Sequence, residues 1–461
     1  MKNLFKIFNR VEKRLIIKSA IFGAGFLLSA LFFTSANAQV LTEAQRGLIL
    51  NKPATVFIST YYEGSVIIQS SADYPPLSGK SYSFKAGAVG SGFVINPDGY
   101  ILTNGHVVKF EDDLLGYEAI RDVITPIIED VLAIEFSKAA NRTPTQAEMD
   151  AMMPAMMQEL GGEAEAINTF YTAYKAGELK LDNIKRDVYV QQGAFVSGKK
   201  IPIKEGTKAD VKVVDFDGFT AEGEVKGKDI GIIKVPQNNM PTTVLGDSDK
   251  VAVGTRINVV GYPGTATFQD FLSKESQLEP TMTAGIISAV KTMKDGTKVL
   301  QTDAALTYGN SGGPAFIEST GEVIGIASLV ATEKGEQKVG FSYLRPSNIA
   351  REFLTGNNIQ NKQGATDTSY RKGLDLFYAK KYSKAIEEFE TALRLYPKLI
   401  DVQDYITKAQ EGIARGEEVK EFPWGWVIAG SVIVVFGFII LVIIIVILVA
   451  RRKKKITPPP A

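Results

Sequence analysis

The chain has 461 residues, and its 52 lysine and arginine residues nearly balance its 51 aspartate and glutamate residues. The net charge of +1 gives no electrostatic case for nucleic acid as the main partner. Cysteine is absent and there is one histidine, which excludes disulfides, thiol catalysis and multi-histidine metal sites, so we expect no metal and no cofactor. A chain of this length is long enough for two or three units, at about 100–200 residues per domain.

Residues 1–38 have the pattern of a secretory signal peptide. A basic leader precedes an apolar run from Ser19 to Phe33, and Ala36-Asn37-Ala38 supplies the small residues of a cleavage site. An uncleaved signal anchor is the alternative. In both cases the chain that follows is exported.

The next unit, residues 39–354, is predicted to be mainly β. From about Pro53 to Tyr343, short runs rich in Val, Ile, Thr, Phe and Tyr alternate with Gly, Asp, Asn and Pro turns, which favours sandwiches or barrels. The predicted strands include Ala54–Thr60, Ala88–Ile95, Ala209–Phe216, Ile230–Val235, Arg256–Tyr262, Met282–Val290, Glu322–Val330 and Lys338–Tyr343.

A helical segment of about residues 111–179 interrupts this β pattern. Its apolar residues recur at helical spacing, and it holds fourteen acidic residues against four basic ones. It also contains five clustered methionines: Met149, Met152, Met153, Met156 and Met157. Methionine-rich surfaces can bind varied apolar partners, but we interpret these residues as packing the helices against each other or against the β unit.

Two further segments follow the β unit. Residues 355–368 read as a polar, flexible linker. Residues 369–414 are predicted to be helical, with Gly373, Ala385, Phe389, Ala392 and Pro397 at the spacing of a tetratricopeptide repeat (TPR). The small residues permit close helix crossing, and Phe389 fills the space between the helices. One such hairpin either binds a peptide or acts as a spacer, and the sequence leaves both readings open.

Residues 424–450 are predicted to form a transmembrane helix. They contain no charged residue, begin with two tryptophans, and are followed by the basic cluster from Arg451 to Lys455. Because positive charge stays on the cytoplasmic side, residues 451–461 should form a cytoplasmic tail. The protein is then a single-pass membrane protein whose body is periplasmic or at the cell surface.

Three motifs carry candidate chemistry. His106 follows a predicted hairpin, Asp229 opens an apolar run, and Ser311 lies in Gly309-Asn310-Ser311-Gly312-Gly313. A serine hydroxyl needs a base to become a nucleophile, and a neutral imidazole suits that role. A carboxylate then orients the imidazole and stabilises its cation. This order of His, Asp and Ser predicts a catalytic triad.

The glycine-rich turn around Ser311 supplies candidates for the remaining requirement, which is an oxyanion hole. The backbone N–H groups of Gly309 and Ser311 can converge on one point. We interpret Gly312 and Gly313 as leaving room for a substrate chain beside Ser311.

Residues 53–354, without the helical segment, resemble the HtrA/Deg branch of trypsin-like serine proteases. The motifs that carry the resemblance are GSGFVINPDGYILTNGHVV, DIGIIKV, LGDSDKVAVGTRINVVGYPG, TAGIISAV, QTDAALTYGNSGGP and VGFSYLRP. The resemblance implies two six-stranded β-barrels with the active site between them. It implies His106 as general base, Asp229 as the orienting carboxylate, Ser311 as nucleophile, and an oxyanion hole from Gly309 and Ser311. Members of this family often form trimers, so a homotrimer is implied as well.

Two features depart from this family. The helical segment widens the gap between the His and Asp motifs, and capping of the cleft, control of access and partner binding are its candidate roles. Asp215 and Asp217, in an expected hairpin turn, are alternatives to Asp229. The PDZ domain that commonly follows the protease is missing, and the TPR-like hairpin and membrane helix stand in its place.

Substrate preference is predicted from the residue six before the nucleophile, which lines the floor of the primary pocket in trypsin-like enzymes. Here it is Ala305, followed by Leu306, so cleavage after small or medium apolar residues is expected. Ser328 and Leu329 are expected in the pocket wall.

The sequence thus predicts a membrane-anchored serine endopeptidase acting outside the cytoplasm on misfolded or regulatory exported proteins. A catalytically silent scaffold that binds peptides and recruits partners through the helical segment or the hairpin is the main alternative. An esterase is a third reading, which the lack of a Gly-x-Ser-x-Gly elbow disfavours.

Overall fold

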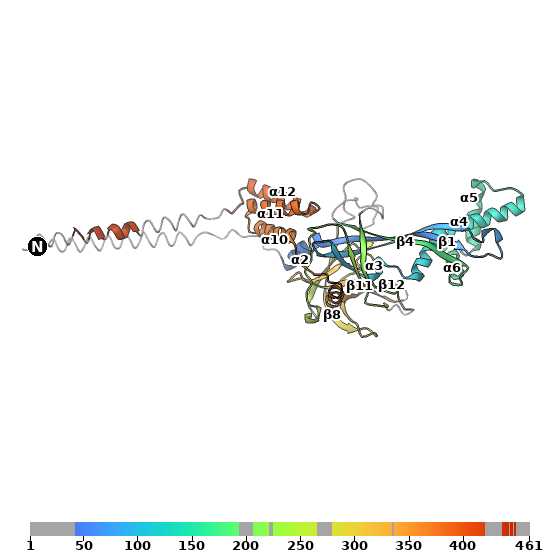
Figure 1. Ribbon diagram of the computed structural model, residues 1–461, viewed down its shortest axis with the longest axis horizontal. Coiled ribbons are helices and arrows are strands. Elements are labelled where there is room, and N and C mark those ends of the chain that lie inside the picture. The colour runs from blue at the N-terminus through green and yellow to red at the C-terminus, as the bar shows by residue number, and fades with distance from the viewer. Residues whose placement is uncertain are drawn as a thin grey trace, which may run out of the picture.

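Two closed six-stranded antiparallel barrels form the centre of the protein (Figure 1). The computed structural model describes residues 42–192, 206–220, 225–264, 279–333 and 336–419, with helical pieces at 436–441, 443–445 and 447–448. The predicted double-barrel architecture is therefore confirmed. The first barrel contains β1 Thr55–Ile68, β2 Ser81–Asn96, β3 Tyr100–Thr103, β4 Leu179–Gln191, β5 Thr207–Asp215 and β6 Ile230–Lys234. The second contains β7 Arg256–Gly261, β8 Thr281–Thr292, β9 Lys298–Thr302, β10 Pro314–Ile317, β11 Val323–Glu333 and β12 Glu336–Pro346.

Three strands of the first barrel run well beyond it. In β2, side chains alternate between exposed and buried over Ser81–Gly87 and are buried from Gly90 to Asn96. Period-2 alternation marks a sheet covered on one face, whereas continuous burial marks a sheet covered on both faces. β1 and β4 continue alongside this extension, with Ile68 opposite Leu179. The predicted strands Ala54–Thr60 and Ala88–Ile95 were thus too short, and β4 was missed.

Three helices cover the extension, and we call the extension and these helices the arm: α4 Asp112–Ala140, α5 Gln146–Glu159 and α6 Glu163–Lys175. Two acidic residues in the first turn of α4 complement the helix dipole, and Asn141 ends the helix in the left-handed conformation. Thr145 and Glu148 form a capping box that starts α5. Figure 1 shows the arm projecting from one end of the barrels, so these helices do not cap the barrel region.

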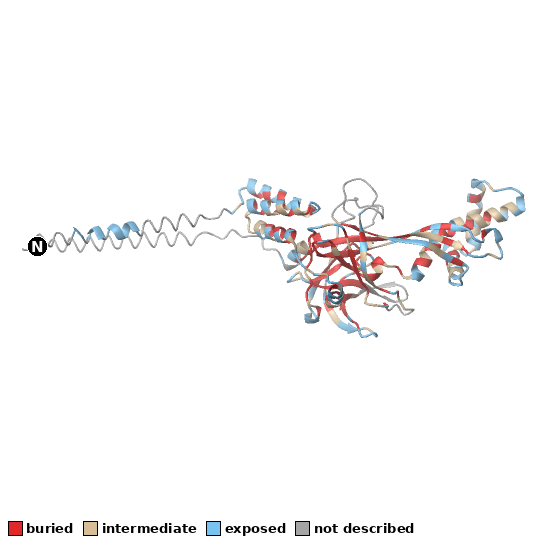
Figure 2. Ribbon diagram, in the orientation of Figure 1, coloured by how far each residue is buried: buried red, intermediate tan, exposed pale blue. Residues whose placement is uncertain are grey.

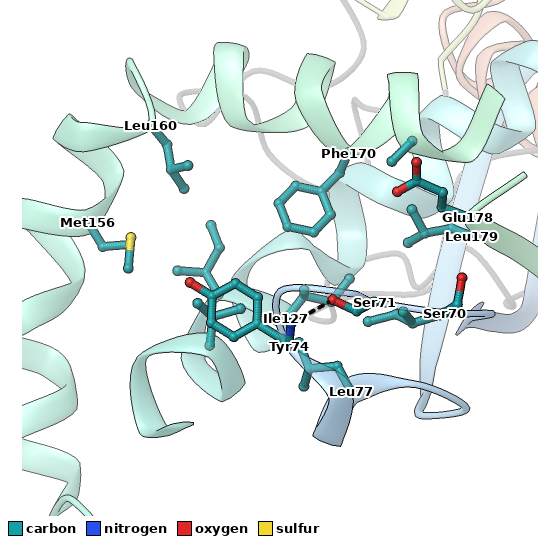
Figure 3. A pocket seen from close by; sticks show the side chains of 14 residues that line it. Ser70, Ser71, Tyr74, Leu77, Ile127, Met156, Leu160, Phe170, Glu178 and Leu179 are labelled. Carbon is teal, nitrogen blue, oxygen red and sulfur yellow. Dashed lines mark hydrogen bonds between the residues drawn. The ribbon is translucent and has the colours of Figure 1, made fainter. Parts of the chain in front are cut away.

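Burial is concentrated in the barrels and along the inner faces of the arm helices (Figure 2). In the arm, Met149 is buried and the other four clustered methionines pack against the same apolar core. The packing interpretation of the methionines is confirmed. The core leaves a cavity of about 230 Å³ between the helices and the far end of β1 (Figure 3). It is lined by Ile68, Ser70, Ser71, Tyr74, Leu77, Ile127, Ile128, Val131, Met156, Leu160, Phe170, Ala173, Glu178 and Leu179.

The C-terminal helices share a core with the first barrel. They are α10 Ala365–Tyr378, α11 Tyr382–Leu395 and α12 Ile400–Ala414. Phe389 packs directly on Gly373, as the repeat-like spacing predicts. Tyr370 and Tyr396 are buried in one cluster with Val56 and Val190 of the barrel. The helices are therefore neither a free spacer nor an independent module.

The connection into these helices is fastened to the barrels. Asn361 donates to the carbonyls of Ile95 and Thr243 (both 2.9 Å) and accepts from the N–H of Leu245 (3.0 Å). The expectation of a flexible linker over residues 355–368 is wrong here, because its polar side chains bind backbone groups instead of water. The part of the chain that the structure describes also contains α2 Glu43–Asn51, η2 Lys52–Ala54, η3 Pro75–Leu77, α3 Gly105–Val108, η4 Ser248–Lys250 and α9 Ser347–Gly356.

The predicted signal peptide (1–38) and cytoplasmic tail (451–461) lie outside the described residues, as does most of the predicted transmembrane segment 424–450. Within the described part of the chain, no helix combines the length and apolarity that a membrane span requires.

Candidate active site

The single histidine and Asp229 meet at the edge of the first barrel. His106 lies on the short helix α3, which follows β3, and Asp229 directly precedes β6, the neighbour of β3 in the sheet. Nδ1 of His106 is 2.9 Å from Oδ1 and 3.0 Å from Oδ2 of Asp229, and the backbone N–H of His106 also donates to Oδ1 (3.0 Å). The carboxylate thus fixes both the ring and its backbone, which leaves Nε2 on the opposite side of the ring.

Asp229 is held in an unusual environment. Its side chain is fully buried and its φ of 56° is in the left-handed region, where non-glycine residues are uncommon. Asn104 donates to its carbonyl (3.1 Å). Burial acts to raise the pKa of Asp229, but the charge and hydrogen bond of His106, the charge of Arg345 and the hydrogen bond of Ser328 lower the pKa below its ordinary value. The carboxyl is therefore ionised at neutral pH.

The second barrel brings Ser311 and Ser328 to the same place. Ser328, on β11, donates its hydroxyl to Oδ2 of Asp229 (2.6 Å). The hydroxyl of Ser311, on the loop between β9 and β10, donates to the carbonyl of Ser328 (3.1 Å). No hydrogen bond joins Ser311 to His106 among the described residues. Ser311 is therefore beside the pair, and rotation of its side chain about the Cα–Cβ bond would redirect the hydroxyl.

Hydrogen bonds to two carbonyl groups fix the orientation of the peptide planes in the loop that carries Ser311. The carbonyl of Tyr308 accepts from the N–H of Gly264 (2.7 Å), and that of Asn310 accepts from the N–H of Gly313 (2.9 Å). In a trans peptide the N–H points opposite to the C=O. The N–H groups of Gly309 and Ser311 therefore point away from these contacts, and neither has a backbone acceptor within the described residues.

Three glycines of this loop are required by the close approach of other backbone segments. Gly309 has a φ of 96°, and a Cβ there would lie 2.2 Å from the carbonyl oxygen of Tyr262. Gly312 has a φ of 89°, and a Cβ would lie 1.9 Å from the carbonyl oxygen of Ser91. A Cβ at Gly313 would lie 2.3 Å from the carbonyl oxygen of Val260. The interpretation that Gly312 and Gly313 make room for substrate is therefore wrong, because β2 and β7 occupy that space.

The four predicted pocket residues have different surroundings. Ala305 is exposed, whereas Leu306 is buried in the core of the second barrel. Ser328 is buried and its hydroxyl donates to Asp229, so it supports the carboxylate of the candidate triad. Leu329 lies on β11, and its side chain is outside what the structure describes.

The alternative acids do not replace Asp229. Asp217 instead contacts the ammonium of Lys109 (3.0 Å), and Asp215 ends β5. Sequence reasoning missed three groups at the site. Phe216 and Phe219 flank the His106 ring at centroid distances of 6.0 and 6.4 Å, and the Arg345 guanidinium is buried beside Asp229. Arg345 follows the predicted strand Lys338–Tyr343, and nothing in the residue pattern there marked it as part of the site.

No group of three or more His, Cys, Asp or Glu side chains suited to a metal ion occurs among the described residues.

Comparison with known proteins agrees with this geometry. Residues 185–326 match the trypsin-like peptidase domain. The match includes Asp229 and Ser311 and begins within β4, after the arm helices α4–α6, which separate His106 from the rest of the barrel sequence. Over residues 185–326 the chain is therefore similar to trypsin-like peptidases.

Individual relatives match only in part. A probable periplasmic serine endoprotease, DegP-like, from Halomonas elongata is 34% identical over 177 residues, which are 37% of this chain and 32% of the relative. The magnetosome formation protease MamE of Paramagnetospirillum magneticum is 32% identical over 185 residues, which are 38% of this chain and 24% of the relative. The chain thus matches about a third or less of the length of these relatives.

Among solved structures, the HtrA-type protease AlgW with a decapeptide is 18% identical, over 68% of this chain and 67% of that chain, with a TM-score of 0.36.

Proposed function

We propose that the protein is a serine endopeptidase that acts outside the cytoplasm on misfolded or regulatory exported proteins. The observation that carries the proposal is that Nδ1 of His106 faces both carboxylate oxygens of buried Asp229, while the Ser311 hydroxyl donates to Ser328, which also binds Asp229. The partial matches to serine endoproteases support the same reaction class.

The chemistry follows from these positions. Nε2 of His106 takes the proton of Ser311 as Oγ forms a bond to the scissile carbonyl carbon, and Asp229 stabilises the resulting imidazolium. The N–H groups of Gly309 and Ser311 donate to the oxyanion. His106 then gives its proton to the leaving amine as the C–N bond breaks, which leaves an acyl-enzyme. In the second half of the reaction His106 takes a proton from water as the water oxygen bonds to the acyl carbon, and gives it to Oγ of Ser311 as the ester C–O bond breaks, which releases the acid and restores Ser311.

Ala305 supports a preference for small or medium apolar residues before the scissile bond, because it brings no acid to the expected pocket floor. Tyr308, beside the oxyanion loop, is 75% exposed and is a candidate contact for substrate.

The decisive experiment is digestion of casein by the full chain and by Ser311→Ala, together with labelling by an active-serine phosphonate. We expect digestion and labelling by the wild type and neither by Ser311→Ala. Ser347→Ala is the matched control, since it removes another buried serine hydroxyl, one that binds the Gly246 carbonyl (2.8 Å). A wild type that is inert in both assays would contradict the proposal.

The alternative function is a catalytically silent peptide-binding scaffold. It is favoured by one observation, which is that the Ser311 hydroxyl donates to Ser328 and not to His106. Catalytic hydrogen bonds are often completed only in the substrate complex, so this contact is compatible with an active enzyme. Phosphonate labelling of Ser311 decides between the two functions.

Membrane anchoring through residues 424–450 is part of the proposal and is supported by the apolar run and the basic residues after it. Removal of residues 422–461 should move the protein from the membrane fraction to the soluble fraction of exported protein. The expected homotrimer is tested on the same samples by mass measurement in solution.

We further propose that the arm, and not the C-terminal helices, docks a protein segment, since the latter already pack against the barrel. The arm cavity of about 230 Å³ is smaller than usual small-molecule pockets of about 300–1,000 Å³, so one or two apolar side chains suit it. Its lining includes adaptable Met156, and the surrounding segment has fourteen acidic and four basic residues. The occupant that fits is an apolar side chain within a basic, unfolded segment.

A fluorescent peptide with a central leucine between lysines tests this docking in the Ser311→Ala chain. Met156→Gln should weaken binding about tenfold, because it places a polar amide in the cavity. Met153→Gln is the control, since Met153 is also partly buried in the arm but does not line the cavity. Equal effects of the two variants, or equal binding of a peptide with glutamates in place of lysines, would rule out the proposed occupant.

A further inference from the structure

Arg345 is a buried cation directly behind the candidate triad. It lies on β12, opposite Ile326 of β11, and is fully buried. Its Nε is 4.0 Å from Oδ2 of Asp229, which belongs to the other barrel. Nη1 donates to the sulfur of Met293 (3.0 Å), whereas Nε and Nη2 have no hydrogen-bond partner in the described part of the chain.

Stability does not explain this arrangement. A thioether is a weak acceptor, and a guanidinium with unsatisfied buried N–H groups carries a desolvation cost. Replacing a whole buried ion pair by apolar side chains of similar size is often neutral or stabilising. Packing of the second barrel therefore does not itself require a cation at position 345, so the charge calls for a role.

The charged groups around Arg345 identify that role. Three carboxylates interact with it: Asp229 before β6, Asp295 in the β8–β9 turn and Asp215 on β5. Asp295 is also near the Lys228 ammonium (4.0 Å) and accepts from Thr297, so it is partly neutralised. Both oxygens of Asp229 also contact Nδ1 of His106. Arg345 and His106 therefore share one buried carboxylate.

We infer that Arg345 is a positioning residue that offsets part of the negative charge of Asp229 and so keeps His106 neutral, and able to accept a proton, at lower pH. The inference rests on the proposed function. A carboxylate alone would favour the imidazolium strongly, and a protonated imidazole cannot act as the base for Ser311. The Arg345 guanidinium weakens this preference for the protonated ring, while the hydrogen bonds from His106 to Asp229 still orient the ring.

The single histidine makes this directly measurable. NMR of the full Ser311→Ala chain, with 13C at histidine Cε1, reports one imidazole signal and needs no catalysis. Arg345→Met should move the titration midpoint of His106 upward by about one pH unit, since removing a nearby cation favours the protonated ring. Arg345→Lys should restore most of the wild-type midpoint. An unchanged midpoint in Arg345→Met would overturn the inference.

Two further variants separate charge from packing. Arg345→Gln retains N–H donors without the charge and should titrate like Arg345→Met; a midpoint like that of Arg345→Lys would mean that only packing matters, which overturns the inference. Arg345→Gln also serves if Arg345→Met does not fold. Arg351→Met is the matched control, because its guanidinium binds the Leu245 and Gly246 carbonyls and its loss should leave the midpoint unchanged.

Activity gives an independent readout. In chains with Ser311 intact, Arg345→Met should move the acid limb of the pH profile of kcat/KM to higher pH, by the same amount as the NMR midpoint. If the wild type proves inert, the proposed function fails while the NMR titration still tests the electrostatic role. A purely structural role would lower thermal stability and leave both the midpoint and the acid limb in place.

Discussion

Ser328 connects the candidate nucleophile to the candidate acid through both of its oxygen atoms. Its hydroxyl donates to Asp229 (2.6 Å), and its carbonyl accepts from Ser311 (3.1 Å). The hydroxyl supplies a charge-assisted hydrogen bond inside the protein, where such bonds are stronger than neutral ones. Ser328 therefore holds Oδ2 of Asp229, which is one of the two oxygens that contact His106.

Ser328→Ala should lower kcat/KM about tenfold, because a hydrogen bond to a buried charge contributes roughly 1.5–3 kcal/mol and part of that loss reaches the transition state. The expected change is in kcat, with KM little altered, and steady-state kinetics on a peptide ester would measure it. Ser347→Ala removes an equally buried hydroxyl and should lower stability alone. A similar loss of kcat in both variants would show that Ser328 acts only through folding.

The residue scale also shows what the sequence can and cannot predict. His106 was predictable because it is the only histidine, whereas Asp229 was predicted from its place between His106 and Ser311 and from the motif DIGIIKV. Ser328 was assigned to a pocket wall and Arg345 was not assigned at all. Both act through side chains that point across the barrel joint, and a one-dimensional pattern carries no information on such contacts.

At the scale of elements, the C-terminal helices are a structural part of the barrel unit. Asp367, on α10, accepts from the N–H and hydroxyl of Thr242 (both 2.8 Å), and Tyr370 donates to the carbonyl of Ile49 (3.1 Å). Their helical periodicity and internal packing were predictable from spacing. Their docking was not, because the apolar face of a helix does not specify which surface covers it.

Tyr370→Ala should therefore destabilise the whole barrel unit, by about 3–5 kcal/mol as for other large buried aromatics. Tyr370→Phe keeps the ring and loses only the bond to Ile49, so about 1 kcal/mol is expected. Denaturant unfolding followed by loss of esterase activity measures both. Lys372→Ala, on the exposed face of α10, should stay within about 0.5 kcal/mol. If Tyr370→Ala left the barrel transition unchanged, the helices would be an independent module.

At the scale of the whole molecule, function depends on the joint between the barrels. His106 and Asp229 belong to the first barrel, whereas Ser311, Ser328 and Arg345 belong to the second. Asp229 is the residue at which these groups meet, through Ser328 at 2.6 Å and Arg345 at 4.0 Å. Its ionisation therefore couples the geometry of the site to the association of the two barrels.

Acid should thus weaken the molecule through Asp229. Its folded pKa lies below the ordinary value, since burial raises it but His106, Arg345 and Ser328 lower it by more. A depressed folded pKa contributes stability above the unfolded value of about 3.9, and that contribution is lost as pH falls through the folded value. Protonation also leaves Arg345 buried without its partner. The thermal midpoint of the wild type should therefore fall more steeply below about pH 4 than that of Asp229→Asn.

Asp367 gives a control of opposite sign. Burial is the largest influence and raises its pKa despite hydrogen bonds from Gly364 and Thr242. Its stabilising contribution is then complete below the unfolded pKa and is lost as pH rises through the folded one. Asp367→Asn should keep the fall of the thermal midpoint below about pH 4. Above the unfolded pKa, its thermal midpoint should depend less on pH than that of the wild type. Thermal unfolding from about pH 2.5 to 7 would compare the three proteins, and parallel curves for the wild type and Asp229→Asn would show that the barrel joint does not depend on this charge.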